Sequence, residues 1–174
     1  MTPTTKRIIV LAMHGSPPSD FPAADRAELF RLKAQISHAV AGSTEEVQAR
    51  YVALETKMRA WPRTAENDPF YAASHALAAA LRQWSGCSVV VGFNEFCAPT
   101  VDEALDAAQS AGAEEVIAVT PMMTRGGAHA EHEIPAAVAA ARARHPGIVI
   151  RYAWPFDVAE VARFLSAQID RPAS

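Results

Sequence analysis

Four short runs of apolar, largely β-branched residues, separated by helical patterns, constrain the fold of this chain most. They cover residues 8–13, 88–93, 116–120 and 147–152. Three of the four runs are almost continuously apolar rather than alternating, which is typical of parallel strands buried on both faces. Helices between successive strands supply the crossovers that such a sheet needs. The sequence therefore predicts an α/β fold, a three-layer sandwich around a four-stranded parallel sheet.

The stretch between the first two strands holds more helix than one crossover requires. Three of the helical patterns, two of them with capping or Pro-start signals, lie between His14 and Cys87. We therefore expect an extra helical pair here, inserted within about residues 43–70 of a single domain that spans 1–174. The Pro-containing segment 62–69 reads as an exposed loop. The stripe formed by Val47, Tyr51, Leu54 and Met58 reads as core or dimer contact rather than a cofactor wall.

Composition excludes several classes of protein. The 174 residues carry a formal net charge of −3, so no basic excess indicates a nucleic-acid partner. The apolar runs are shorter than the ~20 residues of a membrane span, and the start lacks the apolar core of a secretory signal. Cys87 and Cys97 exclude a disulfide framework and a four-cysteine metal site. We expect no membrane association and a cytoplasmic protein.

Chemically capable side chains follow three of the strands. His14 follows the first strand, Glu95 the second, and a loop with His129 and His132 the third. Ligands of open parallel sheets bind outside the carboxyl ends of the strands, so we expect these groups to meet. Two imidazoles and a carboxylate suit Co, Fe, Ni or Zn better than Mg or Ca. Free coordination positions would make such a site reactive rather than structural.

Each of these residues also has a simpler interpretation. Glu95 can serve the helix N-terminus near Thr100, and His129 and His132 can be solvated loop residues. His129 and Glu133 are four residues apart, so one helical turn would place them on a common face. The Arg-Gly-Gly run at 125–127 can be a flexible turn, or a turn that lets the backbone approach an anionic ligand.

Three sequence segments, taken in order, resemble a known family. They are His14-Gly15-Ser16 after a strand, the strand end 93–100, and Gly126-Gly127-Ala128-His129 followed by Glu133-Ile134-Pro135. This set is similar to the short sirohydrochlorin cobaltochelatases and ferrochelatases of the class II chelatase superfamily, over roughly residues 6–16 and 88–170. The chain departs from the family at Met13 and Pro17, at Glu133 where Asp is usual, and in the length of its 14–87 stretch.

The resemblance implies insertion of a divalent metal, Co²⁺, Fe²⁺ or Ni²⁺, into sirohydrochlorin or a related tetrapyrrole, on the routes to cobalamin or sirohaem. The metal is a substrate, and no organic cofactor is implied. The family's metal-contacting and catalytic positions map onto His14, Glu95 and His129. Because one such lobe would pair with a copy of itself to cover a large flat ligand, we expect a homodimer.

A polycarboxylate substrate needs hydrogen-bond donors at the mouth of the site. The candidates for substrate binding are Ser16, Arg125, Gly126 and Gly127, with Lys57, Arg59 and Arg63 of the extra helices as further cations. Two other functions stay open. One is a metal or tetrapyrrole carrier without turnover, and the other is a metal-dependent hydrolase, for which only the two adjacent glycines offer a ligand cradle.

Overall fold

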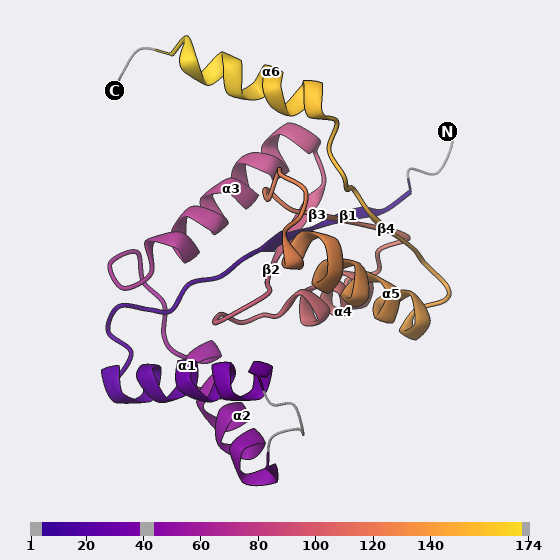
Figure 1. The fold of residues 1–174 in the computed structure, drawn as a ribbon. Coiled ribbons are helices and arrows are strands. Elements are labelled where there is room, and N and C mark those ends of the chain that lie inside the picture. The colour runs from indigo at the N-terminus through magenta and orange to yellow at the C-terminus, as the bar shows by residue number, and fades with distance from the viewer. Residues whose placement is uncertain (1–4, 39–43, 172–174) are drawn as a thin grey trace.

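The computed structural model describes residues 5–38 and 44–171 and contains one parallel sheet within that part of the chain. Its strands are β1 (Arg7–Met13), β2 (Ser88–Phe93), β3 (Glu115–Val119) and β4 (Val149–Tyr152), in the order β2-β1-β3-β4 (Figure 1). The predicted four-stranded parallel sheet is confirmed. Because β1 lies between β2 and β3, the segments that follow these three strands emerge side by side.

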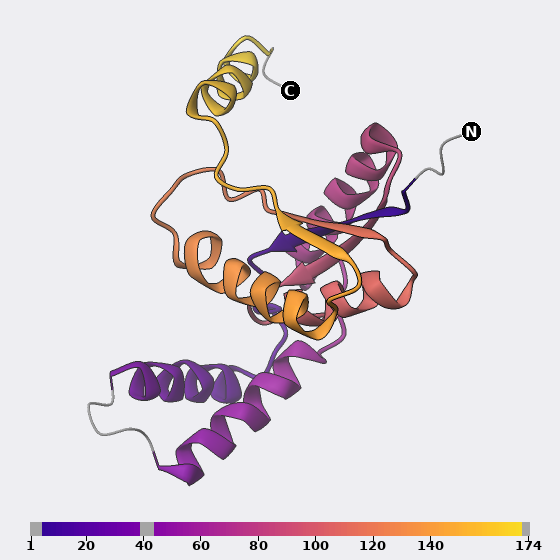
Figure 2. The ribbon, with the colours of Figure 1, turned by 90° about the vertical axis from the view of Figure 1, so that its right-hand side faces the viewer.

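Helices cover both faces of the sheet, so the predicted three layers are confirmed. Helix α3 (Pro69–Ser85) packs on β2 from one face, while α4 (Val101–Ser110) and α5 (Ile134–Arg144) pack on the other (Figure 2). Each face has its own apolar core, one centred on Val10, Leu105 and Val116 and the other on Leu11 and Phe93. Residues of β1 alternate between the two cores, which explains why its sequence is apolar throughout.

The helix starts follow the capping chemistry of the sequence. Thr100 and Glu103, whose Thr-x-x-Glu spacing predicts a capping box, form one at the start of α4. Asp68 caps α3, whose first residue is Pro69. Helix α2 (Glu45–Arg59) is capped by Thr44 through the amide of Val47. The sequence also predicts a capping box that begins at Ser43, and that position lies outside the described residues.

The predicted extra helical pair is formed by α1 (Ala23–His38) and α2, which pack against each other away from the sheet (Figure 2). It lies earlier than the expected segment 43–70, because α3 is the crossover helix and α1 belongs to the pair. We call α1 and α2 the hairpin. The hairpin has a core of its own, which includes Leu54 and Met58, with Val47 and Tyr51 packed against it. The apolar stripe therefore faces a core within the hairpin.

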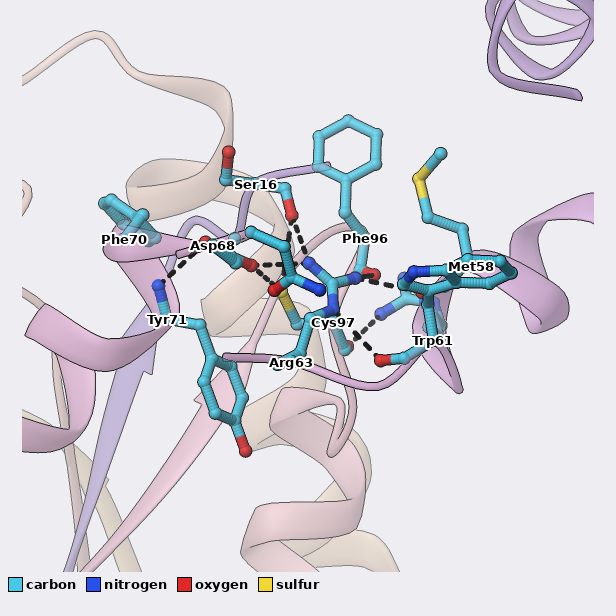
Figure 3. Close-up of polar contacts among 12 residues, drawn as sticks. Ser16, Met58, Trp61, Arg63, Asp68, Phe70, Tyr71, Phe96 and Cys97 are labelled. Atoms are coloured by element: carbon cyan, nitrogen blue, oxygen red, sulfur yellow. Dashed lines mark hydrogen bonds and ion pairs between the residues drawn. The ribbon is translucent and has the colours of Figure 1, made fainter. Parts of the chain in front are cut away.

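The prediction of an exposed loop at 62–69 is wrong for two of its three charged residues, Arg63 and Asp68, whereas the third, Glu66, is exposed. The side chains of Arg63 and Asp68 are 5% and 0% exposed and form an ion pair (Figure 3). The Arg63 guanidinium also donates to the backbone carbonyls of Ser16, Met58 and Phe96. One side chain thus ties the end of α2 to the loops after β1 and β2. The charge is buried because the guanidinium finds acceptors on several sides.

The last helix, α6 (Val158–Ile169), stands apart from the layers at the other end of the molecule from the hairpin (Figures 1 and 2). None of its residues is buried, and Val158, Phe164, Leu165 and Ile169 are exposed. Its N-cap is Asp157, which accepts from the amide of Glu160. Among the described residues, no helix is long and apolar enough to cross a membrane.

Candidate functional site

Three chemically capable side chains that are distant in sequence meet at the carboxyl edge of the sheet. His14, Glu95 and His129 each place one potential ligand atom within 4.8 Å of the other two. In the part of the chain that the structure describes, this is the one group of three or more such residues with that geometry. They arrive from the ends of β1 and β2 and from the segment after β3. The meeting point expected from strand order therefore exists.

Main-chain contacts fix the spacing between His14 and Glu95. The ladder between β1 and β2 continues past the strands, because the amide of Glu95 donates to the carbonyl of His14 at 2.9 Å. Gly15 has a φ of +98°, and a Cβ built there would lie 1.9 Å from the carbonyl oxygen of Glu95. Only glycine fits at this position, since it tolerates the positive φ and leaves room for the neighbouring backbone.

His129 enters the site from a short π-helical turn, η1 (His129–Glu133), that leads directly into α5. The sequence predicts this helix to begin at about Glu131 or Pro135, whereas helical structure begins at His129. The hydroxyl of Tyr152 on β4 donates to the carbonyl of Ala130 at 3.0 Å and anchors the turn. Burial raises the pKa of Tyr152 to about 12, so the hydroxyl stays protonated as a donor. π-helical turns occur frequently at functional sites.

The hydrogen bonds of the two imidazoles indicate which nitrogens are free. Nδ1 of His14 lies 2.9 Å from the carbonyl oxygen of Gly15, and Nδ1 of His129 lies 2.7 Å from Oε2 of Glu133. Both partners are acceptors, so we assign the proton of each neutral ring to Nδ1. The Nε2 lone pairs are then available. The rings meet edge to face, with centroids 4.5 Å apart.

The donor set fits a first-row transition metal. Two imidazole nitrogens and a carboxylate oxygen match the ligand preferences of Fe, Co, Ni and Zn ions. Ligand atoms that bind one ion with bonds of about 2.1 Å lie about 3–3.5 Å from one another. The three ligand atoms in this structure lie within 4.8 Å of one another, so they would have to move somewhat closer to bind one ion. Small rotations of the side chains would close that gap. The carboxylate behind His129 corresponds to the outer partner that orients many metal-bound histidines.

The hairpin forms one wall beside this cluster. A cavity of about 200 Å³ lies between the hairpin and the loop after β2, and its lining includes Glu95, Glu133, Tyr51 and Lys33. Burial raises the pKa of Tyr51 to about 12, with a further contribution from the nearby Glu55. Lys33 of α1 forms an ion pair with Oε1 of Glu95. The carboxylate of the cluster thus already has a cationic partner in the protein.

The predicted substrate-binding residues have more partners than their sequence suggests. The backbone carbonyl of Ser16 accepts from Arg63, while Arg125 is largely exposed. Glu131, which sequence reasoning missed, accepts from the amide of Gly126 at 3.0 Å and lies 3.3 Å from Nε of Arg125. These contacts lower the pKa of Glu131, the amide of Gly126 contributing most. An anionic ligand would have to compete with Glu131 for these donors.

The extra cations expected at the mouth of the site serve mainly structural contacts. Arg63 is buried, so its prediction as a substrate-facing cation is wrong. Arg59 donates to the carbonyls of Asn94 and Cys97 behind the loop after β2. Lys57 pairs with Asp25 within the hairpin at 2.6 Å. Of the two residues left open near His129, Glu133 contacts that imidazole, whereas His132 is exposed and lies outside the three-residue cluster.

An apolar surface adjoins the segment between β3 and η1. Two cavities of about 170 and 290 Å³ share Met123, Phe156 and Val161 in their lining, and the larger one also contacts Arg125. Apolar walls next to an exposed guanidinium suit a ligand with an apolar body and an anionic edge. Phe156 and Val161 come from the start of the α6 region, where no sequence motif pointed to a ligand.

A family model described as CbiX matches residues 65–171 of this chain, which is more than half of it. The match contains Glu95 and His129, whereas His14 and the hairpin precede it. A sirohydrochlorin ferrochelatase of Priestia megaterium is 34% identical over 70 residues, covering 40% of this chain and 26% of the relative. The chain thus spans about a quarter of that relative's length.

Solved structures with similar folds include two of SirB from Bacillus subtilis. One is the sirohydrochlorin chelatase SirB of subspecies spizizenii in complex with cobalt, at 20% identity and a TM-score of 0.47 over 95% of this chain and 50% of that one. The other is SirB with Fe³⁺, also at 20% identity and with a TM-score of 0.47, over 97% of this chain and 49% of that one. A putative cobalamin biosynthesis CbiX protein from Marinobacter aquaeolei VT8 is 19% identical, with a TM-score of 0.41 over 95% of this chain and 99% of that one.

Proposed function

Because this chain belongs to the CbiX family, we propose that it is a chelatase that inserts a divalent metal into sirohydrochlorin or a related tetrapyrrole. The observation that carries the proposal is the cluster of His14, Glu95 and His129, whose ligand atoms lie within 4.8 Å of one another. The curated relative named a sirohydrochlorin ferrochelatase supports the choice of substrate. Co²⁺ and Fe²⁺ are the metals we favour, with Ni²⁺ as a further candidate for the same donor set.

The three side chains would hold the ion with coordination positions left open toward the macrocycle. Insertion replaces two pyrrole protons by one divalent ion, so the site must also accept protons. As the ion leaves, the Nε2 atoms of His14 and His129 become free to accept them. Glu133, bonded to Nδ1 of His129, would stabilise the imidazolium that forms there. Each of the two histidines therefore has two successive roles, first holding the metal and then holding a proton.

The macrocycle would lie against the apolar surface formed by Met123, Phe156 and Val161. Its carboxylates would then meet Arg125 and, once Glu131 is displaced, the amide of Gly126. Gly127 and Ser16 are the remaining candidates for contacts with the substrate. This arrangement suits a large flat ligand, because the apolar wall and Arg125 line the same cavity.

We further propose one domain over residues 1–174 and a homodimer in the cytoplasm. Arg63 joins the hairpin to the loops after β1 and β2, which supports a single folding unit. The apolar residues exposed on α6 support a contact with a second copy. Cys87 and Cys97 are both free, in keeping with a reducing compartment.

The decisive experiment is metal insertion under anaerobic conditions, with sirohydrochlorin and Co²⁺ or Fe²⁺, followed by absorption spectroscopy. We expect a rate above the protein-free control for the wild type and for His38→Ala, an exposed histidine on α1. The double variant His14→Ala with His129→Ala should lose at least about 100-fold in rate. Full activity of that variant would overturn the proposed site. Tight tetrapyrrole binding without insertion would instead identify a carrier.

A further inference from the structure

The Glu95 carboxylate is not free in this structure, since Lys33 of α1 forms an ion pair with it across 62 residues of sequence. The Lys33 ammonium also lies 5.6 Å from the centre of the Phe96 ring. Two independent contacts therefore hold it at this place. The side chains of Lys33 and Glu95 are 39% and 20% exposed, so the pair is partly shielded from solvent.

Backbone and ring geometry keep the Phe96 side of this contact in place. Phe96 has a φ of +61°, in the left-handed region that is unfavourable for a residue other than glycine. Its ring contacts Phe30 of α1 edge to face, with centroids 5.7 Å apart. Its backbone carbonyl accepts from the buried Arg63. Phe30 of the hairpin and Arg63 just after it therefore both hold Phe96, the residue next to Glu95, which limits the distance that the Lys33 side chain has to span.

A divalent ion on the three-residue cluster would compete with this lysine. Oε1 of Glu95 is already bonded to the ammonium. A metal must either displace Lys33 or share the carboxylate with it, and sharing places two cations close together at a partly shielded site. Like charges at such a distance repel. In either case, the lysine weakens metal binding relative to the same three ligands without it.

We propose that Lys33 is a resident counterion that competes with the metal substrate for Glu95 and so keeps metal binding to the cluster weak and reversible. The hairpin thereby acts on the reaction directly, because it supplies the competing cation. When the ion departs to the macrocycle, the ammonium returns to the carboxylate and prevents it from retaining the metal. Lys33 acts on the metal through Glu95, so it is a positioning residue and not a catalytic one. The inference rests on the proposed metal site at His14, Glu95 and His129.

The test measures the binding of Co²⁺ to the untagged protein at low ionic strength, by calorimetry and by the visible absorption of bound Co²⁺. We expect Lys33→Met to bind Co²⁺ roughly tenfold more tightly than the wild type, which corresponds to about 1.4 kcal/mol. Removal of the ion by excess chelator should be correspondingly slower. Lys33→Arg keeps the positive charge and should bind like the wild type. Circular dichroism and thermal unfolding would verify that the variants fold.

The hairpin also supplies a matched control. Lys57 of α2 pairs with Asp25 of α1 at 2.6 Å, so Lys57→Met removes another lysine from an ion pair in the same hairpin. Its Co²⁺ affinity should equal that of the wild type. In a Glu95→Gln background, Lys33→Met should no longer tighten binding, since the group for which the two cations compete is gone.

The outcomes separate this inference from the function on which it rests. If the wild type binds no Co²⁺ that depends on His14 and His129, the proposed metal site fails. If the wild type binds Co²⁺ and Lys33→Met binds it equally or more weakly, the site stands and the counterion role is overturned. Equal tightening by Lys57→Met would also overturn it, because the effect would then reflect overall charge.

Discussion

The hairpin and α6 are both helical segments outside the three layers, yet they relate to the rest of the molecule in opposite ways (Figure 2). The hairpin has its own apolar core, a buried ion pair at its base and a lysine on the site carboxylate. Helix α6 buries no residue and exposes large apolar side chains. The hairpin thus buries its apolar residues within one chain, whereas α6 has an apolar face without a partner in the described structure.

This difference separates two ways in which a helical addition can serve a site. The hairpin contributes through polar contacts that reach the loops after β1 and β2 and through the contact of Phe30 with Phe96, while its apolar core holds the two helices together. On α6 the exposed apolar residues are the ones that can make such contacts, and they adjoin the cavities proposed for the macrocycle. Substitutions in the hairpin should therefore change stability and metal binding. Those in α6 should change assembly or substrate binding.

The largest expected effect is the loss of the link at the base of the hairpin. Arg63→Met would leave Asp68 charged, buried and without its partner, as well as several carbonyls without a donor. We expect the free energy of unfolding to fall by about 3–5 kcal/mol. Urea denaturation followed by circular dichroism measures it.

The control is Arg50→Met, which breaks an exposed pair with Glu28 between the two helices of the hairpin. Exposed pairs contribute little, so its unfolding curve should overlie that of the wild type. If the two arginine variants lost equal stability, the buried link would have no special role and the contrast with α6 would weaken.

A second experiment compares a leucine from each segment. Leu54→Ala removes buried side-chain volume from the hairpin core, where the residue is 3% exposed, and should cost about 2–4 kcal/mol. In the monomer, Leu165→Ala on α6 acts on a residue that is 52% exposed, and it should change stability by less than about 0.5 kcal/mol at protein concentrations below the dissociation constant of the proposed dimer. Thermal or urea unfolding measures both. A large loss for Leu165→Ala at those concentrations would mean that the chain itself covers α6 in solution.

The third effect concerns assembly. If α6 mediates the proposed homodimer, the double variant Phe164→Ser with Ile169→Ser should raise the dissociation constant at least about tenfold. Sedimentation velocity over a dilution series measures this constant. Arg50→Met serves again as the control and should leave the sedimentation profile unchanged. A dimer that resists the α6 changes would place the contact elsewhere, and a monomeric wild type would remove the dimer proposal.

The smallest effect is at alkaline pH. Burial raises the pKa of Tyr51 in the hairpin and of Tyr152 on β4 to about 12, above the ordinary tyrosine value of 10.0. A group whose pKa is higher in the folded state than in the unfolded state stabilises the folded state at pH values below the unfolded-state pKa. That contribution is lost as the pH rises from about 10 to about 12. Tyr51→Phe and Tyr152→Phe should each make the decline of Tm over this range shallower. An unchanged decline in both would contradict the burial effect.

The parts of the molecule that could be predicted from sequence are those set by local pattern and strand direction. Continuous apolar runs indicated the parallel sheet, and the carboxyl ends of β1 and β2 indicated where His14 and Glu95 would meet. Spacing also placed Glu133 on the same turn as His129. These features need only the chain direction and the period of an element, both of which a single sequence contains.

The remainder depends on how the hairpin lies on the sheet, which has no periodic signature. Nothing at position 33 distinguishes that lysine from the other cations of the hairpin, yet it is the one that reaches Glu95. Arg63 and Asp68 stand in a stretch whose composition indicates exposure, and tertiary contacts bury them. Arg59 and Lys57 appeared equally suited to a substrate, although each has a structural partner.

The close approach at Gly15 sets a limit on how this site can be redesigned. Since the His14 and Glu95 segments meet through their main chains, the separation of the backbone positions that carry the imidazole and the carboxylate cannot be widened by changing nearby side chains. A pocket for a larger cation would require shifting one strand past its neighbour, with every residue of β1 or β2 changing faces. Selectivity among ions of similar size therefore has to be adjusted from outside that contact, at His129 or from the hairpin.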